Sequence, residues 1–473
     1  MTARRGPVLA VVALLLVAGG LADRARRPSR PAATEVSTAA VMPTAAPEGA
    51  ASASWYCPGA TAAPGSPAVG TVVIANTGER QVNALVTAIG SDGGVHPSPV
   101  RLAPYSVARV GLAQLAPGPF AGALVEVDAG RVVAELEAVG PRQNAVTPCA
   151  STVSDRWHFA DGSTARDAVL TLSLFNPFPD DAIADLSFST DQGRDTPSDF
   201  EGIVVPPRSL VVKNIGDHVR RREAVATNVA VRRGRLVAAQ TLTRTAPGRS
   251  GLSLTLGAPS PGTVWYFPSG AIDNGVVERF SISNTTSREA KVLVEVNLDE
   301  GAAEPFELTI PPHDRVALVM NEEDRIPNAV GHSTTVRSLN DVPVVVARTT
   351  EAGPPATRTG RADTVGARRG ATEWAFAAGG VSPQADQWLA VQNVGTTPAR
   401  VSVFGVAGRL LPLPDLQGVT VDPGRRLVIK LSDHAATSPL PLVVRSTRPV
   451  VVDRTIYSTD RQCLSATIGV PLR

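Results

Sequence analysis

The chain has 473 residues, 43% hydrophobic and 19% charged, so it is globular rather than disordered and too long for one ordinary core. Its net charge of +2 provides no overall field that would attract nucleic acid. The 41 glycines and 40 prolines favour many short strands joined by tight turns over a low-complexity chain.

The N-terminus predicts export from the cytoplasm. Arg4 and Arg5 precede an uncharged apolar run over residues 8–22, which is the layout of an export signal. We expect residues 1–27 to be retained as a signal-anchor in the plasma membrane, with the body outside the cytoplasm. The run is shorter than the roughly 20 residues that span a bilayer, so cleavage and secretion is the alternative. Residues 28–54 are rich in Ala, Pro, Thr and Ser, which predicts a flexible linker.

Four of the five tryptophans recur at intervals of 102, 108 and 109 residues, and such a period indicates tandem repeats. An asparagine follows each of them after about 20 residues. The repeated positions are Trp55, Trp157, Trp265 and Trp374, with Asn76, Asn176, Asn284 and Asn393. Apolar side chains alternate on both sides of each asparagine, which predicts a β-hairpin with one buried face. We expect each repeated tryptophan to anchor a core, and we expect the same of Trp388, which stands outside the repeat pattern.

These repeats predict an all-β protein of four tandem sandwich domains, immunoglobulin-like or fibronectin-like, because each unit of about 100 residues contains several short strands. The predicted boundaries are residues 55–150, 151–258, 259–368 and 369–473, here called repeats 1 to 4. The alternative is a closed ring of four sheets, as in a propeller. Propeller blades are usually shorter than these units, so the sandwich is favoured.

The cysteines predict one disulfide. Cys57 lies on the first predicted strand of repeat 1 and Cys149 just after its last, and the first and last strands of a sandwich can lie close together. A Cys57–Cys149 bridge needs an oxidising compartment, which agrees with the export signal. Cys463 is then left over, and we expect it to be a small buried apolar residue.

The sequence shows no arrangement typical of catalysis. It lacks the motifs that place a serine nucleophile, a zinc-binding histidine pair or a phosphate-binding glycine loop, so we expect neither an enzyme nor a cofactor or metal site. Repeat 2 holds two groups of arginines that form a candidate polyanion-binding site. These are Arg220, Arg221, Arg222, Arg232, Arg233 and Arg235. Seven acidic side chains between residues 180 and 201 are a weaker candidate for catalysis.

The chain resembles a family of uncharacterised actinobacterial exported proteins, classed as a domain of unknown function. The resemblance rests on the N-terminal anchor, the Trp-x-Cys-Pro-Gly start at residues 55–59, and Cys149 ahead of the Trp-x-Phe-x-x-Gly-Ser-Thr motif that begins at Trp157. It spans most of residues 50–473. It implies an actinobacterial envelope setting and no known activity, and no catalytic residue carries over.

We therefore expect a non-enzymatic cell-envelope protein that acts outside the cytoplasm as a scaffold or spacer for protein partners, with its repeats in a rod. A cell-wall carbohydrate- or polyanion-binding array is the second hypothesis, and it rests on the sandwich folds and the arginines of repeat 2. An envelope hydrolase or transferase is a third and weaker one. Nucleic acid is not expected as a partner, because no aromatic residues alternate with the arginines.

Overall fold

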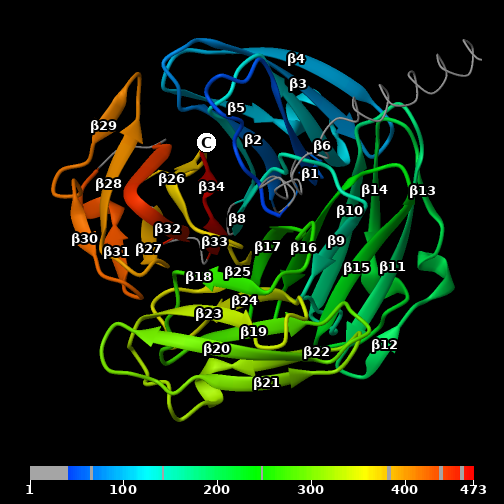
Figure 1. Ribbon diagram of the computed structural model, residues 1–473. Helices are drawn as coiled ribbons and strands as arrows, with labels where there is room; N and C mark the ends of the chain where they lie inside the picture. The colour runs from blue at the N-terminus through cyan, green and yellow to red at the C-terminus, as the bar shows by residue number, and fades with distance from the viewer. Residues whose placement is uncertain are drawn as a thin grey trace, which may run out of the picture. The chain divides into compact units, whose positions relative to one another are not determined.

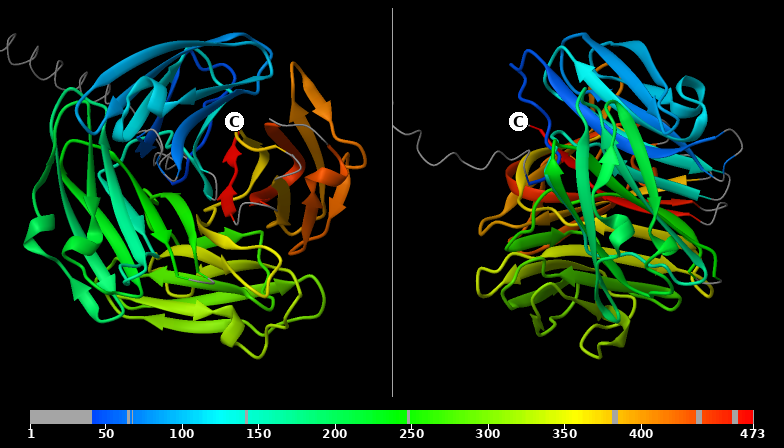
Figure 2. Two further views of the ribbon diagram at one scale, coloured as in Figure 1. Left: turned by 180° about the vertical axis from the view of Figure 1, so that it is seen from behind. Right: turned by 90° about the vertical axis from the view of Figure 1, so that its right-hand side faces the viewer.

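The computed structural model describes residues 41–472, apart from residues 64–65, 67, 141–142, 247–248, 381–384, 436–439 and 459–462. The predicted signal-anchor lies outside the described residues. Within them no helix has the length and apolar character that crossing a membrane requires. Strands fill the described chain from end to end, and helices are confined to single turns (Figure 2). The helical turns are α2 (Leu112–Leu115), η2 (Ser198–Phe200), η3 (Ile215–Asp217), η4 (Met320–Glu322) and η5 (Leu431–Asp433).

Repeat 1 consists of two antiparallel sheets of four strands each. The first sheet has the order β1 (Ala53–Ala62), β6 (Gly118–Val127), β3 (Val82–Gly90) and β4 (Val95–Leu102). The second has the order β5 (Ser106–Gly111), β2 (Val69–Asn76), β7 (Val132–Gly140) and β8 (Gln143–Pro148). Repeat 1 therefore has two sheets, and so do repeats 2 and 3, which are described next. This confirms the prediction of all-β sandwiches rather than the single-sheet blades of a propeller.

Repeats 2 and 3 follow the same plan. The first sheet of repeat 2 joins β12 (Gly193–Asp195), β11 (Ala182–Thr190), β15 (Val225–Arg233) and β9 (Arg156–Phe159), with β13 (Ile203–Val205) on β11. Its second sheet joins β14 (Ser209–Asn214), β10 (Ala168–Asn176), β16 (Val237–Arg244) and β17 (Gly251–Leu256). The first sheet of repeat 3 joins β18 (Val264–Phe267), β23 (His332–Ser338), β20 (Ala290–Leu298) and β21 (Phe306–Ile310). Its second sheet joins β22 (Arg315–Val319), β19 (Val276–Ser283), β24 (Val345–Ala352) and β25 (Gly360–Val365).

Repeat 4 differs because one long strand, β32 (Leu442–Ser458), runs through both of its sheets. The first half of β32 pairs with β28 (Ala399–Val406) and β26 (Ala371–Phe376), and the second half pairs with β27 (Ala385–Asn393) and β33 (Leu464–Ile468). The shorter strands are β29 (Leu410–Pro412), β30 (Val419–Val421), β31 (Arg426–Lys430) and β34 (Val470–Pro471).

Alternating side chains place the core of each repeat between its two sheets. In β3 the side chains of Val82, Ala84 and Val86 are buried, whereas the intervening Asn83 and Leu85 are exposed. The repeated tryptophans lie in these cores, each at most 1% exposed, as the sequence predicts. In three repeats the indole N–H donates to a backbone carbonyl directly before or within the equivalent inner strand, which is β16, β24 or β32. The acceptors are Leu236, Val344 and Val450 for Trp157, Trp265 and Trp374.

The predicted hairpin at each repeated asparagine is wrong. In repeat 1, Asn76 ends β2, which pairs with β5 and β7, whereas β3 pairs with β4 and β6 in the other sheet. The connection is therefore a corner between the two sheets. Two strands that face one core from opposite sheets show the same alternation of buried and exposed side chains as the two strands of a hairpin, so the sequence pattern does not separate the two cases. Asn284 shows what the asparagine does there. Its buried side-chain amide donates to the carbonyls of Arg288, Ile310 and Pro311, so it holds the corner to the turn before the next strand.

A short segment before repeat 1 is packed against the body. Residues 41–48, here called the strap, belong to the predicted linker, yet several of their side chains are buried. The backbone N–H of Thr44 donates to the Ser151 hydroxyl in repeat 2, and the N–H of Ala45 donates to the Pro471 carbonyl in repeat 4. The strap therefore connects repeats that lie far apart in the sequence, and the predicted linker does not extend through residues 41–48.

The last inner strand of each repeat contacts the equivalent strand of the next. β8 contacts β17, β17 contacts β25, β25 contacts β33, and β33 contacts β8, so the contacts close a circle (Figure 1). Hydrogen bonds between these strands cross all four junctions. They run from Leu256 N–H to Thr147 Oγ1 (3.0 Å), Thr255 Oγ1 to the Asp363 carbonyl (3.4 Å), Thr364 Oγ1 to the Ala466 carbonyl (3.0 Å) and Val146 N–H to Ser465 Oγ (3.0 Å). The expected rod is wrong, because repeats 1 and 4 are in direct contact.

Candidate functional site

The arginines of repeat 2 do not form one patch. Three of them precede β15 and three lie at or beyond its far end, and a nine-residue strand separates its ends by about 26 Å. Arg232 pairs with Asp185, and Arg235 pairs with Asp155 at 3.3 Å. Arg222 donates to the side-chain carbonyl of Gln192. The predicted polyanion-binding residues are therefore divided between two places, and some already have acidic partners.

The predicted disulfide is present, with Cys57 and Cys149 at a Cα–Cα distance of 4.5 Å. Cys463 lies outside this bridge and is buried. Among the described residues, no group of three or more His, Cys, Asp or Glu side chains is arranged to hold a metal ion.

Charged side chains are buried where repeats 2 and 3 meet, here called junction 2–3. Asp161 of repeat 2 accepts hydrogen bonds from Ser281 (2.7 Å), Thr349 (2.9 Å) and Arg361 (2.8 Å), all of repeat 3. Burial alone would raise the pKa of the Asp161 carboxyl, but the guanidinium groups of Arg279 and Arg361 outweigh burial and hold that pKa below its usual value. The charges at this junction therefore satisfy one another and fill the space.

The equivalent positions at junction 3–4 carry different residues and leave the space open. Four positions are compared. The first is the fourth residue after the repeated tryptophan in the earlier repeat of the junction. The other three are in the later repeat: the fifth residue before the repeated asparagine, and two residues paired across its last two inner strands. At junction 2–3 they hold Asp161, Arg279, Glu351 and Arg361, and at junction 3–4 they hold Ser269, Trp388, Tyr457 and Leu464. All four of the latter line a cavity of about 600 Å³. Cavities of this size are typical of small-molecule sites.

One wall of this cavity, here called the 3–4 cavity, is aromatic and cationic. Arg358 of repeat 3 lies over two rings of repeat 4, with its guanidinium carbon 5.1 Å from the centre of Trp388 and 3.9 Å from that of Tyr457. Burial raises the pKa of the Tyr457 hydroxyl, so this ring stays neutral. Trp388, expected in a core, is instead half-buried on this wall. The rings orient Arg358 without neutralising its charge.

A buried ion pair lies behind the same wall. Arg348, which is 2% exposed and lines the 3–4 cavity, donates through Nη2 to the carboxylate of Asp453 at 3.1 Å. Its other terminal nitrogen, Nη1, has no hydrogen-bond partner among the described residues, and the same holds for the indole nitrogen of Trp388. Burial raises the pKa of Asp453 to about 6 despite the adjacent guanidinium. Two hydrogen-bond donors of the lining residues are therefore buried without a partner.

A second buried acid near Arg348 is already engaged. Glu278 lines the 3–4 cavity, and its carboxylate lies 3.2 Å from His332 Nε2 and accepts from the backbone N–H of Ala271. Burial would raise the pKa of Glu278, but the interaction with His332 outweighs it, so the pKa lies below its usual value. Glu278 is thus an anion with both oxygens occupied, and it holds the cavity wall together.

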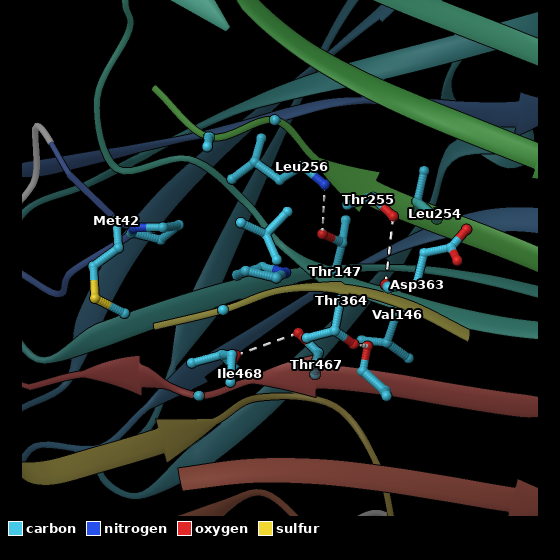
Figure 3. A pocket seen from close by; sticks show the side chains of 18 of the residues that line it. Met42, Val146, Thr147, Leu254, Thr255, Leu256, Asp363, Thr364, Thr467 and Ile468 are labelled. Carbon is cyan, nitrogen blue, oxygen red and sulfur yellow. Dashed lines mark hydrogen bonds between the residues drawn. The ribbon is translucent and has the colours of Figure 1, made fainter. Parts of the chain in front are cut away.

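A second space lies among the last inner strands of all four repeats, next to Met42 of the strap (Figure 3). Its volume is only about 60 Å³, and its lining is mainly apolar, with Val146, Leu254 and Ile468 among the residues on it. Such a space holds one or two waters at most. It is a packing gap between the repeats and not a ligand site.

Sequence reasoning missed the 3–4 cavity, although one signal pointed to it. Trp388 is the only tryptophan outside the repeat pattern, and the equivalent residues in repeats 1 to 3 are Thr71, Thr171 and Arg279. A large aromatic side chain at a position that is otherwise polar breaks the repeat. The other residues of the wall, such as Arg348 and Arg358, carry no local signal that separates them from the many surface arginines.

Comparisons with known proteins identify one domain and no function. A model described as "Family of unknown function (DUF5719)" matches residues 142–246, which cover most of repeat 2. No curated protein matches the chain. A Thermotoga maritima structure titled "Crystal Structure of Thermotoga maritima 1070" is similar at 24% identity over 23% of this chain and 95% of that chain, with a TM-score of 0.21. The Anabaena sensory rhodopsin transducer is similar at 24% identity over 18% of this chain and 94% of its own, with a TM-score of 0.17. At such low overlap these likenesses identify neither fold nor function.

Proposed function

We propose that the chain is a non-enzymatic binding protein of the cell envelope that holds a saccharide of that envelope in the 3–4 cavity. The observation that carries the proposal is the cavity of about 600 Å³ whose wall combines aromatic rings with unused hydrogen-bond donors. Binding sites of this kind orient a ligand by a few polar groups on a mainly apolar lining. The proposal favours the carbohydrate hypothesis over the spacer, because repeats 1 and 4 contact each other.

The setting outside the cytoplasm is part of the proposal. The Cys57–Cys149 disulfide supports an oxidising compartment, because such bridges persist mainly outside the cytoplasm. The basic and apolar N-terminal sequence also supports export. We propose that residues 1–27 anchor the chain in the plasma membrane of an actinobacterial cell. Detection of the intact N-terminus in the membrane fraction would support anchoring, whereas its absence from secreted protein would support cleavage.

Calorimetric titration of the full chain with a panel of envelope saccharides tests the binding function. We expect saturable binding that is lost in Ala356→Trp, which places a large side chain at the cavity lining. Leu339→Trp is the matched control, because Leu339 of repeat 3 is 50% exposed and lies outside the lining. Binding that survives Ala356→Trp unchanged would place the ligand elsewhere, and no binding across the panel would refute the function.

A further inference from the structure

We infer that the ligand is an acidic saccharide whose carboxylate binds between Arg348 and Arg358 in the 3–4 cavity. This inference rests on the proposed binding function and adds the chemical class of the ligand. It draws on the contrast between two equivalent junctions of one chain, one filled by a carboxylate and the other open.

Junction 2–3 shows how a carboxylate is held at this place in the fold. The carboxylate of Asp161 accepts hydrogen bonds from Thr349 and Arg361 at 2.9 and 2.8 Å. At junction 3–4 the position of Asp161 holds Ser269, and the position of Thr349 holds Thr455, which lines the 3–4 cavity. The hydroxyl donor is thus kept at the open junction while the protein's own carboxylate is missing. The other two donors, Ser281 and Arg361, correspond to Ala390 and Leu464, so the cations for a ligand carboxylate have to come from elsewhere on the lining.

Three arginines line the 3–4 cavity. Arg426 of repeat 4 is already paired with Asp299, which leaves Arg348 and Arg358 of repeat 3. Arg348 has a terminal nitrogen without a partner, and Arg358 forms no ion pair with any described carboxylate. The two acids on the lining are already engaged. Glu278 interacts with His332 and accepts from the N–H of Ala271, whereas Asp273 accepts from the N–H of Asn274. Asp453 Oδ1 behind the wall also lacks a partner, but the unpartnered side-chain atoms of the lining residues themselves, Arg348 Nη1 and Trp388 Nε1, are donors. We therefore expect the ligand to supply acceptors. Arginine binds a carboxylate through two parallel N–H groups, which makes it the strongest such acceptor here.

The test compares two sugars that differ by one lactyl group, which bears a carboxylate. N-acetylmuramic acid carries a lactyl carboxylate that N-acetylglucosamine lacks, and both are titrated into the full chain with its disulfide intact. A charge-assisted hydrogen bond stabilises by about 1.5–3 kcal/mol, so we expect the acid to bind at least about tenfold more tightly. Glucuronic acid against glucose repeats the comparison on a second sugar.

Two pairs of variants locate the carboxylate. Ser269→Asp supplies an internal carboxylate as in repeat 2 and should weaken binding of the acid at least about tenfold, whereas the uncharged Ser269→Asn should leave it within about twofold. Arg358→Gln should also weaken it. Arg325→Gln should not, because Arg325 lies 4.3 Å over the Phe306 ring, outside the cavity lining.

The outcomes separate this inference from the function on which it rests. Equal affinity for acid and neutral sugar, or an unchanged affinity in Ser269→Asp, overturns the carboxylate inference and leaves saccharide binding standing. Absence of binding by every saccharide of the panel overturns both. Unfolding midpoints in urea, measured for each variant, establish that lost binding is not lost folding.

Discussion

Asp161 provides the sharpest test of how the repeats are joined. Its carboxylate belongs to repeat 2 but is hydrogen-bonded to Ser281, Thr349 and Arg361 of repeat 3, and its side chain is 3% exposed. Asp161→Ala leaves Arg361 buried with one carboxylate fewer. Removing one partner of a buried ion pair costs about 3–5 kcal/mol. That is a large part of the roughly 5–15 kcal/mol by which a folded protein is usually stable.

Urea unfolding followed by tryptophan fluorescence measures this loss. Asp155→Ala is the matched control, because Asp155 is in the same repeat and pairs with Arg235 on the surface, where both side chains are more than half exposed. We expect the control to lose at most about 1 kcal/mol. The reasoning would be refuted if Asp161→Ala lost no more than the control.

The pH dependence gives a second reading of the same carboxylate. The folded-state pKa of Asp161 lies below the unfolded value of 3.8, so its stabilising contribution is present above that value and is lost as the pH falls through the folded-state pKa. The difference in unfolding free energy between wild type and Asp161→Ala should therefore shrink below about pH 4. A difference that stays constant to pH 2 would contradict the charged interaction.

Four further predictions address the fold and the cavity. Replacing Cys57 and Cys149 by serine should lower the unfolding free energy by about 4–5 kcal/mol, since the bridge closes a loop with a sequence separation of 92; urea unfolding of the oxidised and serine forms checks this. Asn284→Ala should cost about 2–3 kcal/mol in the same assay, because buried carbonyls lose their donor. Deleting the strap, residues 41–48, should raise amide hydrogen exchange in β34 and at the ends of β1 and β26, and unchanged exchange would show that the strap is not needed. Affinity for the acidic sugar should rise by up to about tenfold per pH unit as the pH falls from 7.5 to 5.5. Asp453 is faced by Arg348, Arg454 and Glu278, and its protonation in this range frees Arg348 for the ligand.

The sequence predicts those parts of the fold that depend on local pattern. The spacing of Trp157, Trp265 and Trp374 locates three cores, because a buried aromatic residue has to recur at the same place in each copy. The Cys57–Cys149 bridge follows from strand order alone. The corner at Asn76 differs from the predicted hairpin, because alternation says which face of a strand is buried and not which sheet the strand joins.

The junctions could not be predicted because their partners are far apart in the chain. Arg361 meets Asp161 across 200 positions, and Arg454 meets Glu135 across 319. In a sequence with 45 basic and 43 acidic residues, nothing local marks these four as buried. Their pairing becomes visible only once the repeats are placed side by side.

Repeat proteins of this kind allow a site to be found by comparing copies. Positions that hold a core or a turn stay alike in all four repeats, whereas the junction positions have diverged. Junction 2–3 satisfies its buried charges internally, and junction 3–4 replaces Asp161 and Arg361 by Ser269 and Leu464 and so gives up that stabilisation. A hollow with unpaired donors lowers stability, and proteins accept such costs mainly where a ligand offsets them. The charged set is present only at junction 2–3, since the position of Asp161 holds Gly59 at junction 1–2 and Ala378 at junction 4–1. What sets junction 3–4 apart is its cavity with unpaired donors, and that cavity is the argument that something else binds there.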